Sequence, residues 1–345
     1  MDIDYEFDGE VRRLHVSDGD SAKPLVVLLH GTAGDVRDMT DPAASPGHNY
    51  DSRAALRPDR DVGWRGYPGV GVWSFELDGM KDVRSWRDAL AAYGFRTAAY
   101  SQVDSTGFLA RPVRELATVV GILRKNLPEA RLVLLAQSRG GLLARQFLKD
   151  EPDLATRIDK LITLHTPHGG SELANVAVAL RAAIQDLQQV AGGVATTALG
   201  WLLDIVDSDA YKELAVGSAF LRDLGEDPPS GIDCFTFGGT SVRLTRVLSW
   251  VYTLSSALPQ FHWPPFHHEI TLIEVPLVSP VADSLPNLVD EIANGRGDLL
   301  TADARTRFAL APHRTNSINH AESLWDLDLQ AQVLAILGES GAFWE

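Results

Sequence analysis

The chain has 345 residues, 45% of them hydrophobic, which suffices for a large α/β core. A formal net charge of −15 at pH 7 argues against nucleic acid or anionic membrane as the main partner. The single cysteine, Cys234, excludes an internal disulfide framework and suits a reducing compartment. The acidic N-terminus lacks a signal-peptide pattern, and no stretch supplies the roughly 18 consecutive apolar residues of a membrane span. We therefore expect a soluble, cytoplasmic protein without stable membrane insertion.

Strand-like runs alternate with helical patterns, which is typical of a mostly parallel sheet covered by helices. Core strands are expected at 25–29, 96–100, 132–136, 160–164 and 233–237. Helices are expected at about 82–93, 112–127, 141–148 and in a last run that ends at 337. A long loop rich in Pro, Gly and Asp is expected from Asp35 to about Tyr67.

Two segments interrupt the alternation. Residues from about 171 to 229 are rich in Ala, Leu and Val and contain no strand candidate, so we expect a helical cap inserted over the sheet. An apolar and aromatic segment at about 243–269, broken by prolines, is a candidate second lid. The prediction is one domain, 1–345, with its core at about 20–170 and 230–340.

The most informative motif is Ala136-Gln137-Ser138-Arg139-Gly140, which lies between a strand-like run and a helix-like segment. That order predicts a nucleophile elbow, a sharp turn that lifts one serine above a parallel sheet. The small residues at 136 and 140 leave room for the backbone where the turn closes. Ser138 would lie at a helix N-terminus, which favours a developing negative charge. The same pattern recurs at 43–47, but in a loop with no strand before it, so the context selects Ser138.

A serine hydroxyl becomes an effective nucleophile when a histidine, oriented by a carboxylate, removes its proton. In this architecture the chain order is serine, acid, histidine. We therefore predict His320 as the base and Asp298, in a Gly-rich turn 22 positions earlier, as the acid. The competing acids downstream of Ser138 are Asp233, Glu274, Asp283, Asp290 and Glu291.

An oxyanion hole requires two preorganised N–H donors. We predict the backbone N–H groups of Thr32 and Arg139, the first after a core strand and the second directly after the nucleophile. A glycine before Thr32 would let the backbone approach the substrate. The residues expected to border the substrate are His30, Gly31, Gln137, His168 and Trp263. For His168, a structural role in its Thr-Pro-His turn is the favoured alternative.

These pieces together resemble the α/β-hydrolase fold, and most closely the bacterial true lipases and esterases. The motifs that carry the resemblance, in the order of that family, are His30-Gly31-Thr32, Ala136-Gln-Ser138-Arg-Gly140, Thr166-Pro167-His168-Gly169-Gly170, Gly297-Asp298-Leu299-Leu300 and Asn319-His320. The resemblance implies a Ser–His–Asp hydrolase that acts on a small hydrophobic ester or lipid and needs no cofactor. Arg139 departs from the Met or His usual in the family. It either places a cation at the mouth of the site, favouring acidic or polar substrates, or pairs with a cap carboxylate.

Metal binding is not expected. Some relatives hold a structural calcium near the histidine, but Glu322 is only a faint hint of one and we assign none. We interpret His262, His267 and His268 as part of a loop packed at the cap rather than as metal ligands. The aromatic residues of that segment either line a pocket or pack in the core; they are Trp250, Tyr252, Trp263 and Phe266.

Other functions use the same residues. A phospholipase, thioesterase, amidase or acyltransferase could carry the same triad. A hydrolase-like binding protein without catalysis is the alternative from a different class. The joint presence of a nucleophile, an acid, a base and both oxyanion loops argues against it, and carboxylic-ester hydrolysis is the favoured interpretation.

Overall fold

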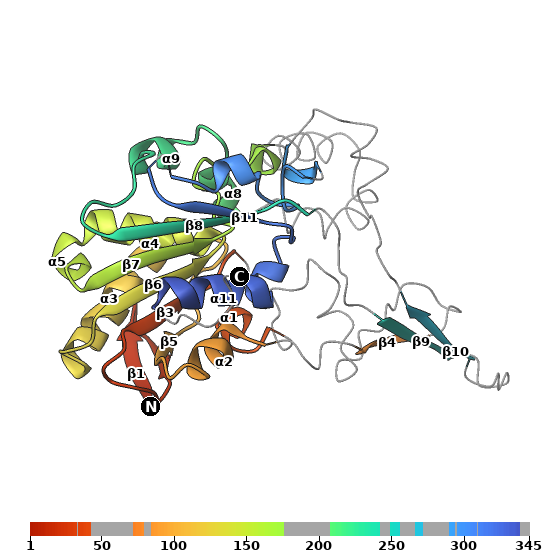
Figure 1. Ribbon diagram of the computed structural model, residues 1–345, viewed down its shortest axis with the longest axis horizontal. Helices are drawn as coiled ribbons and strands as arrows, with labels where there is room; N and C mark the ends of the chain where they lie inside the picture. Colours follow the sequence, from red (N-terminus) through yellow and green to blue (C-terminus); the bar gives the residue numbers. More distant parts are fainter. Residues whose placement is uncertain are drawn as a thin grey trace.

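The computed structural model describes residues 1–32, 34–42, 72–78, 84–175, 208–241, 249–255, 266–271, 290–293, 295–308 and 310–338. Its largest element is an eight-stranded sheet in the order β1-β2-β5-β3-β6-β7-β8-β11 (Figure 1). The strands of this sheet are β1 (Asp2–Phe7), β2 (Glu10–Val16), β3 (Leu25–Leu29), β5 (Thr97–Ala99), β6 (Leu132–Gln137), β7 (Ile158–Leu164), β8 (Asp233–Gly239) and β11 (His313–Asn316). Neighbours from β5 to β11 pair in parallel, whereas β1, β2 and β5 pair antiparallel. The mostly parallel sheet predicted from the sequence is confirmed.

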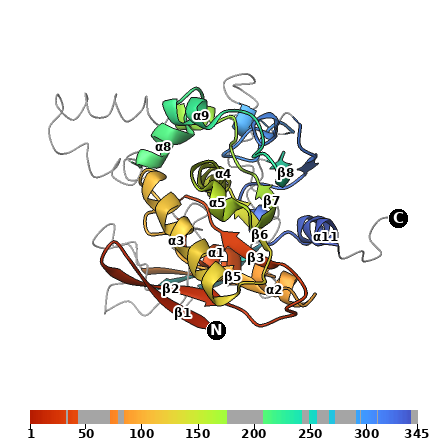
Figure 2. The ribbon, with the colours of Figure 1, turned by 90° about the vertical axis from the view of Figure 1, so that its left-hand side faces the viewer.

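Helices cover both faces of this sheet. In Figure 2, α3 and α4 lie on one side of the row of strands, and α2 and α11 lie on the other. The α-helices are α1 (Arg37–Thr40), α2 (Trp86–Ala91), α3 (Ala110–Asn126), α4 (Arg139–Asp150), α5 (Pro152–Ala155), α8 (Asp209–Leu214), α9 (Ala219–Leu224) and α11 (Leu327–Ile336). Short 3-10 turns are η5 (Asp290–Ile292), η6 (Asp303–Arg305) and η7 (Glu322–Leu324).

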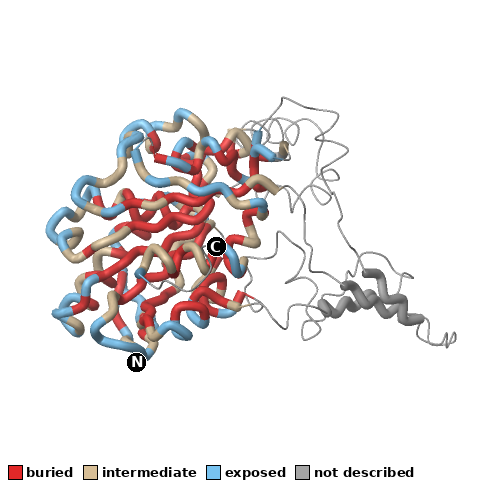
Figure 3. Tube along the Cα trace, in the orientation of Figure 1, coloured by how far each residue is buried: buried red, intermediate tan, exposed pale blue. Residues whose placement is uncertain are grey.

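The central strands β3 and β6 are buried at every position, and all of their residues except the last of β6, Gln137, are apolar, as expected for strands with both faces covered (Figure 3). In β3, Leu25, Val27 and Leu29 belong to one hydrophobic cluster, whereas Val26 and Leu28 belong to the other. The first cluster includes side chains of α3 and α4, and the second includes side chains of α2 and α11. This double burial fixes the register of the strands, and so it fixes where each loop leaves the sheet.

Two parts of the main sheet were not expected from the sequence. The N-terminal hairpin, β1 and β2, extends the sheet through antiparallel pairing with β5. At the other edge, β11 is a short strand of sequence His-Arg-Thr-Asn with no buried residue. Its polar side chains carry no hydrophobic signal, so neighbouring residues on β8 provide its pairing and its place in the sheet.

The segment expected to be a second lid is partly formed of strands rather than loop. β9 (Ser249–Ser255) pairs antiparallel with both β10 (Phe266–Thr271) and β4 (Val72–Asp78), giving a separate three-stranded sheet. Of the three histidines assigned to a packed loop, His267 and His268 therefore belong to a strand. The Thr, Val and aromatic content of these runs suits an extended backbone. His262 and Trp263 lie outside the described residues.

The expected cap is described at its two ends. Its first end runs to residue 175, and the chain re-enters at 208 with α8 and α9, both helical as predicted. A bridge between Ser171 and Ala215 joins the two ends. The cap between these ends, residues 176–207, lies outside the described residues, as do 43–47 and most of the loop expected between Asp35 and Tyr67.

Among the described residues, no helix combines the length and the apolar character needed to cross a membrane. Cys234 on β8 is buried, and burial raises the pKa of its thiol to about 12. A thiol that stays protonated at neutral pH is a poor nucleophile, in agreement with a structural role.

One buried carboxylate ties the N-terminal hairpin to the rest of the fold. Glu115 on α3 is fully buried and accepts hydrogen bonds from the Tyr5 hydroxyl at 2.9 Å and from the backbone N–H of Val103 at 2.6 Å. It also forms an ion pair with Arg12 on β2. Three separate segments therefore meet at one side chain.

We expect Glu115→Leu to lower the free energy of unfolding by about 3–5 kcal/mol, because it leaves a largely buried guanidinium and an N–H without their acceptor. Urea unfolding followed by circular dichroism measures the change. The control is Asp4→Ala, which breaks the exposed Asp4–Arg13 pair on the same hairpin and should cost less than about 1 kcal/mol. Equal losses in the two variants would contradict the role assigned to Glu115.

Candidate active site

Ser138 lies at the turn between β6 and α4, in the strained backbone of an elbow. Its φ is 54° and its ψ is −131°, a region that residues other than glycine seldom adopt. The turn is held by hydrogen bonds on both sides of the peptide. The Ser138 N–H donates to the carbonyl of Leu164 at 2.8 Å, and the Thr166 hydroxyl donates to the Ser138 carbonyl at 2.7 Å. The strain is therefore supported by the neighbouring strand β7.

Small residues around Ser138 are required by close packing. A Cβ on Gly140 would lie 2.7 Å from the carbonyl oxygen of His30, at the end of β3. A Cβ on Gly31 would lie 2.8 Å from the Cβ of Ser138. Both contacts are closer than real side chains allow, so the elbow and the loop after β3 meet only because both positions are glycine.

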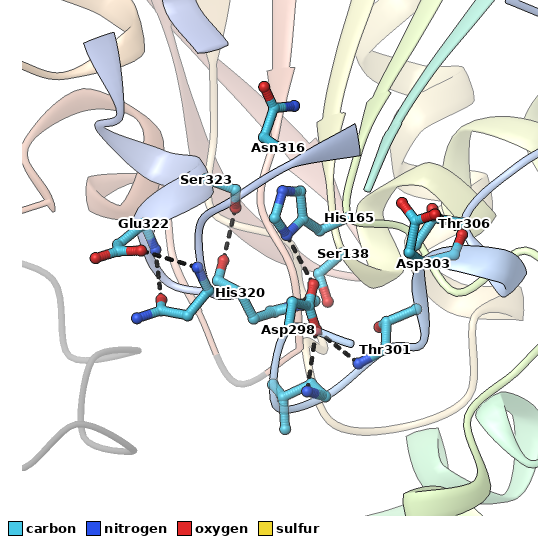
Figure 4. Close-up of polar contacts among 12 residues, drawn as sticks. Ser138, His165, Asp298, Thr301, Asp303, Thr306, Asn316, His320, Glu322 and Ser323 are labelled. Carbon is cyan, nitrogen blue, oxygen red and sulfur yellow. Dashed lines mark hydrogen bonds and ion pairs between the residues drawn. The ribbon is translucent and has the colours of Figure 1, made fainter. Parts of the chain in front are cut away.

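Asp298 and His320 contact each other as the sequence predicts. The Asp298 Oδ2 lies 2.9 Å from the Nδ1 of His320, and the His320 backbone N–H donates to the Asp298 carbonyl at 2.8 Å (Figure 4). The other carboxylate oxygen accepts from the N–H groups of Leu300 and Thr301 at 3.0 and 2.7 Å. Burial alone would raise the pKa of Asp298, but the imidazole of His320 and the hydrogen bonds to the carboxylate hold it well below its usual range.

A second imidazole shares this carboxylate, and sequence reasoning did not identify it as a site residue. The Nδ1 of His165 lies 2.7 Å from the same Oδ2 of Asp298. His165 directly follows β7 and precedes the Thr-Pro-His turn, and a histidine at the carboxyl end of a core strand was the available signal. The three side chains present ligand atoms within 4.8 Å of one another. Because these atoms already satisfy one another by hydrogen bonding, we interpret the group as a hydrogen-bonded network and assign no metal.

The loop that carries His320 is fixed locally. The backbone N–H of Asn319 donates to Glu322 at 2.8 Å, and the N–H of Glu322 donates back to the Asn319 side chain at 2.9 Å. This reciprocal pair has the hydrogen-bond pattern of a capping box and fixes the turn that precedes η7. It accounts for the Asn-His pair and gives Glu322 a structural role in place of a calcium ligand. The Ser323 hydroxyl then donates to the His320 carbonyl at 2.7 Å.

A cavity of about 310 Å³ opens at Ser138 and His320. Its polar wall includes Thr32 and Gln137, both predicted to belong to the site. Its other walls are mostly apolar and come from residues 167–174, from α8 and from the turns that follow Asp298 and His320. The apolar lining residues are Pro167, Leu173, Ala174, Tyr211, Leu214, Leu299, Leu300, Ala321 and Leu324.

Two histidines expected near the substrate do not line this cavity. His30 is buried, and its Nε2 accepts the backbone N–H of Gln102 at 2.9 Å, so its proton resides on Nδ1. His168 is also buried, stacks on Phe308 and contacts the Thr163 hydroxyl at 3.0 Å. Both rings are therefore held by contacts within the protein, outside the lining of this cavity.

Arg139 does not place a cation at the mouth of the site. Its side chain is 1% exposed and donates to the carbonyls of Ser105 and Gly107. It also forms an ion pair with Glu213 on α8 at 3.3 Å. Of the two alternatives that the sequence left open for Arg139, this is the one in which a carboxylate from the segment 171–229 is its partner. Glu213 accepts in addition from the N–H of Leu109 at 2.9 Å.

The described competing acids face elsewhere. Asp233 and Asp290 pair with Lys160 and Arg296 at the surface. The buried Glu291 accepts the N–H of Glu172 at 2.7 Å, at the start of the cap. Glu274 and Asp283 lie outside the described residues. Within the described part of the chain, Asp298 is the acid that contacts His320.

No protein-family model matches the chain, and a search of curated proteins gives no match. Solved structures do resemble it. The mature lipase BlEst2 of Bacillus licheniformis is 18% identical with a TM-score of 0.53, over 94% of this chain and 97% of that one. Its propeptide form is 17% identical with a TM-score of 0.54, over 95% of this chain and 54% of that one. A metagenomic carboxyl esterase is 15% identical with a TM-score of 0.49, over 93% and 77% of the two chains. The likeness to BlEst2 shows that this chain has the α/β-hydrolase fold.

We expect Glu213→Ala to lower the free energy of unfolding by about 3–5 kcal/mol, because it leaves the Arg139 guanidinium buried without its counter-charge. Denaturant unfolding provides the measurement. Lys212→Ala, which breaks the exposed Lys212–Asp209 pair on the same helix, is the control and should cost less than about 1 kcal/mol. A Glu213→Ala variant as stable as this control would rule out an energetic role for the buried pair.

The buried imidazole of His30 should make stability depend on pH. Burial lowers the pKa of His30 to about 4, whereas an unfolded histidine titrates near pH 6.5. Between these values the unfolded chain binds a proton that the folded chain excludes. The contribution of His30 is therefore complete above pH 6.5 and is lost as the pH falls towards 4.

Urea unfolding at pH 7 and pH 4.5 tests this linkage. His30→Gln keeps an acceptor for the Gln102 N–H, and its stability should fall less with acid than that of the wild type, by up to about 3 kcal/mol. The exposed His15→Gln variant should behave like the wild type. Identical acid sensitivity of the wild type and His30→Gln would refute the prediction.

Proposed function

We propose that the protein is a serine hydrolase that cleaves carboxylic esters through an acyl-enzyme. The observation that carries this proposal is the contact of His320 with the buried Asp298 carboxylate, next to the cavity that Ser138 lines. A strained elbow serine, an imidazole oriented by a carboxylate and an adjoining apolar cavity are what acyl transfer requires.

The roles of the residues follow from their protonation. An ionised Asp298 can only accept hydrogen bonds, so the Nδ1 of His320 carries a proton and the Nε2 is free to act as the base. That Nε2 is buried and has no hydrogen-bond partner among the described residues. In the proposed reaction it takes the Ser138 proton as Oγ attacks the acyl carbon, and then returns it to the leaving alkoxide. In the second half of the reaction, water attacks the acyl carbon while His320 takes its proton. The proton then passes to the Ser138 oxygen as the carboxylic acid leaves.

The negative charge that develops on the carbonyl oxygen requires N–H donors. We assign them to the backbone of Thr32, at the cavity wall, and of Arg139, in the first turn of α4, where a helix supplies no acceptor for its N–H groups. Gln137 lies in the same wall, and Gly31 packs closely against the Gln137 and Ser138 side chains. These donors would face the oxyanion above the elbow.

The substrate we propose is a hydrophobic ester or lipid with an uncharged acyl group. Leu173, Tyr211 and Leu214 contribute apolar walls from the two ends of the cap, and Leu300 contributes one from the turn after Asp298. No charged group from Arg139 reaches this cavity, since its side chain is buried and paired. We also propose that a cap at about 171–229 and a second lid at about 243–269 determine the shape of the substrate that the site accepts.

We expect Ser138→Ala to lose at least about a thousandfold in turnover, because it removes the nucleophile and leaves only the surrounding electrostatic stabilisation. Hydrolysis of p-nitrophenyl esters from acetate to palmitate measures the loss, and a fluorophosphonate should label the wild type at Ser138. Ser230→Ala, at an exposed serine remote from the cavity, is the control and should retain full turnover. Undiminished hydrolysis by Ser138→Ala, or no hydrolysis and no labelling in the wild type, would contradict the proposal and favour a binding protein.

A further inference from the structure

His165 is held in an unusual position. It follows the last buried residues of β7, is 0% exposed and has a φ of 52°, in the left-handed region that a histidine adopts at a cost. Its backbone N–H donates to the carbonyl of Phe237 on β8 at 2.8 Å. A Cβ on Gly239 would lie 2.3 Å from the His165 ring, so a glycine on the neighbouring strand makes room for it. Strand pairing and packing therefore direct this ring towards Asp298.

The two imidazoles donate to one oxygen. The Oδ2 of Asp298 lies 2.7 Å from the Nδ1 of His165 and 2.9 Å from the Nδ1 of His320, and Figure 4 shows the carboxylate between the two rings. Their rings are edge-on, with an interplanar angle of 73° and centroids 5.9 Å apart. Because a carboxylate only accepts, both Nδ1 atoms carry protons in this arrangement. The tautomer of each ring is thus fixed by the same oxygen.

The rings differ in their access to the cavity. His320 lines it, whereas His165 is not among the described residues that line it. Direct contact with a substrate therefore falls to His320. The contribution of His165 is instead to Asp298, whose Oδ1 is held by two backbone N–H groups and whose Oδ2 is held by the two imidazoles.

We propose that His165 is a positioning residue of the site, a second imidazole that fixes the Asp298 carboxylate in the plane that His320 requires. The proposal rests on the proposed hydrolase function. Without the His165 N–H, Oδ2 would keep a single side-chain donor, and the carboxylate could turn away from His320. Orientation of the base within the acyl-transfer geometry would then be lost, while the cavity that binds the substrate would be unchanged.

Two variants distinguish the effect of the hydrogen bond that His165 donates from the effect of its side-chain volume. His165→Leu removes the donor but keeps an apolar side chain of similar size. In His165→Asn the carboxamide nitrogen can take the place of Nδ1 as donor. We expect kcat for a p-nitrophenyl ester to fall roughly tenfold or more in His165→Leu, with KM changed less than about twofold, and to recover most of that loss in His165→Asn. His313→Leu, which removes an imidazole that pairs with Asp303 and does not line the cavity, should keep the wild-type kcat.

Proton NMR tests the geometry independently of turnover. In Ser138→Ala, where catalysis is absent, two strongly deshielded imidazole N–H protons are expected, one from each ring bonded to Asp298. Both substitutions at 165 should remove the proton of that ring. The remaining proton, on His320, should be weakened in His165→Leu, where the carboxylate is free to turn, and retained in His165→Asn. Thermal unfolding verifies that each variant is folded.

The outcomes are distinct. An active wild type with an equally active His165→Leu variant would overturn the positioning role and leave the hydrolase function intact. A single deshielded proton in Ser138→Ala, or a His165→Asn variant as slow as a folded His165→Leu variant, would also overturn it. A wild type that neither hydrolyses esters nor reacts with a fluorophosphonate would instead contradict the proposed function itself.

Discussion

The site depends on the hydrogen bonds that the buried Asp298 carboxylate accepts. A carboxylate with no exposed surface is tolerated because N–H donors from separate parts of the chain surround both of its oxygens. Those donors come from the end of β7, from the turn that Asp298 itself begins and from the loop before η7. The charge therefore requires these segments to be assembled, and in return it orients the imidazoles around it.

The sheet supplies the geometry that brings those segments together. Parallel strands with both faces buried cannot slip in register without exposing apolar side chains, so their carboxyl ends stay aligned. The loop after β3, the elbow after β6 and the turn after β7 consequently meet at one edge. Glycines at 31 and 140 then allow a closer approach than any other residue would. The fixed register of the buried strands therefore fixes the positions of the loop residues at this edge of the sheet.

Motifs with a strong local requirement could be predicted from the sequence. The elbow was recognisable because small residues flank Ser138 between an apolar run and a helix. The order serine, acid, histidine left several acids open, and the Gly-rich turn before His320 favoured Asp298 among them. Features that arise from pairing between distant segments could not be predicted. β11 has polar residues and takes its place from β8, and His165 has a role only because β7 ends beside Asp298. His267 and His268 of β10 were assigned to a loop because the prolines at 259, 264 and 265, which lie between β9 and β10, dominated the reading of this segment.

The buried pair of Arg139 and Glu213 has a consequence for how the chain can diverge. One partner directly follows Ser138, and the other lies on the helix that contributes Tyr211 and Leu214 to the cavity wall. Replacing either residue alone would leave a buried charge without its counter-charge, whereas two apolar residues could replace the pair together. The two positions should therefore be inherited as a unit. Descendants that remodel α8 would be expected to exchange the residue after the serine at the same time.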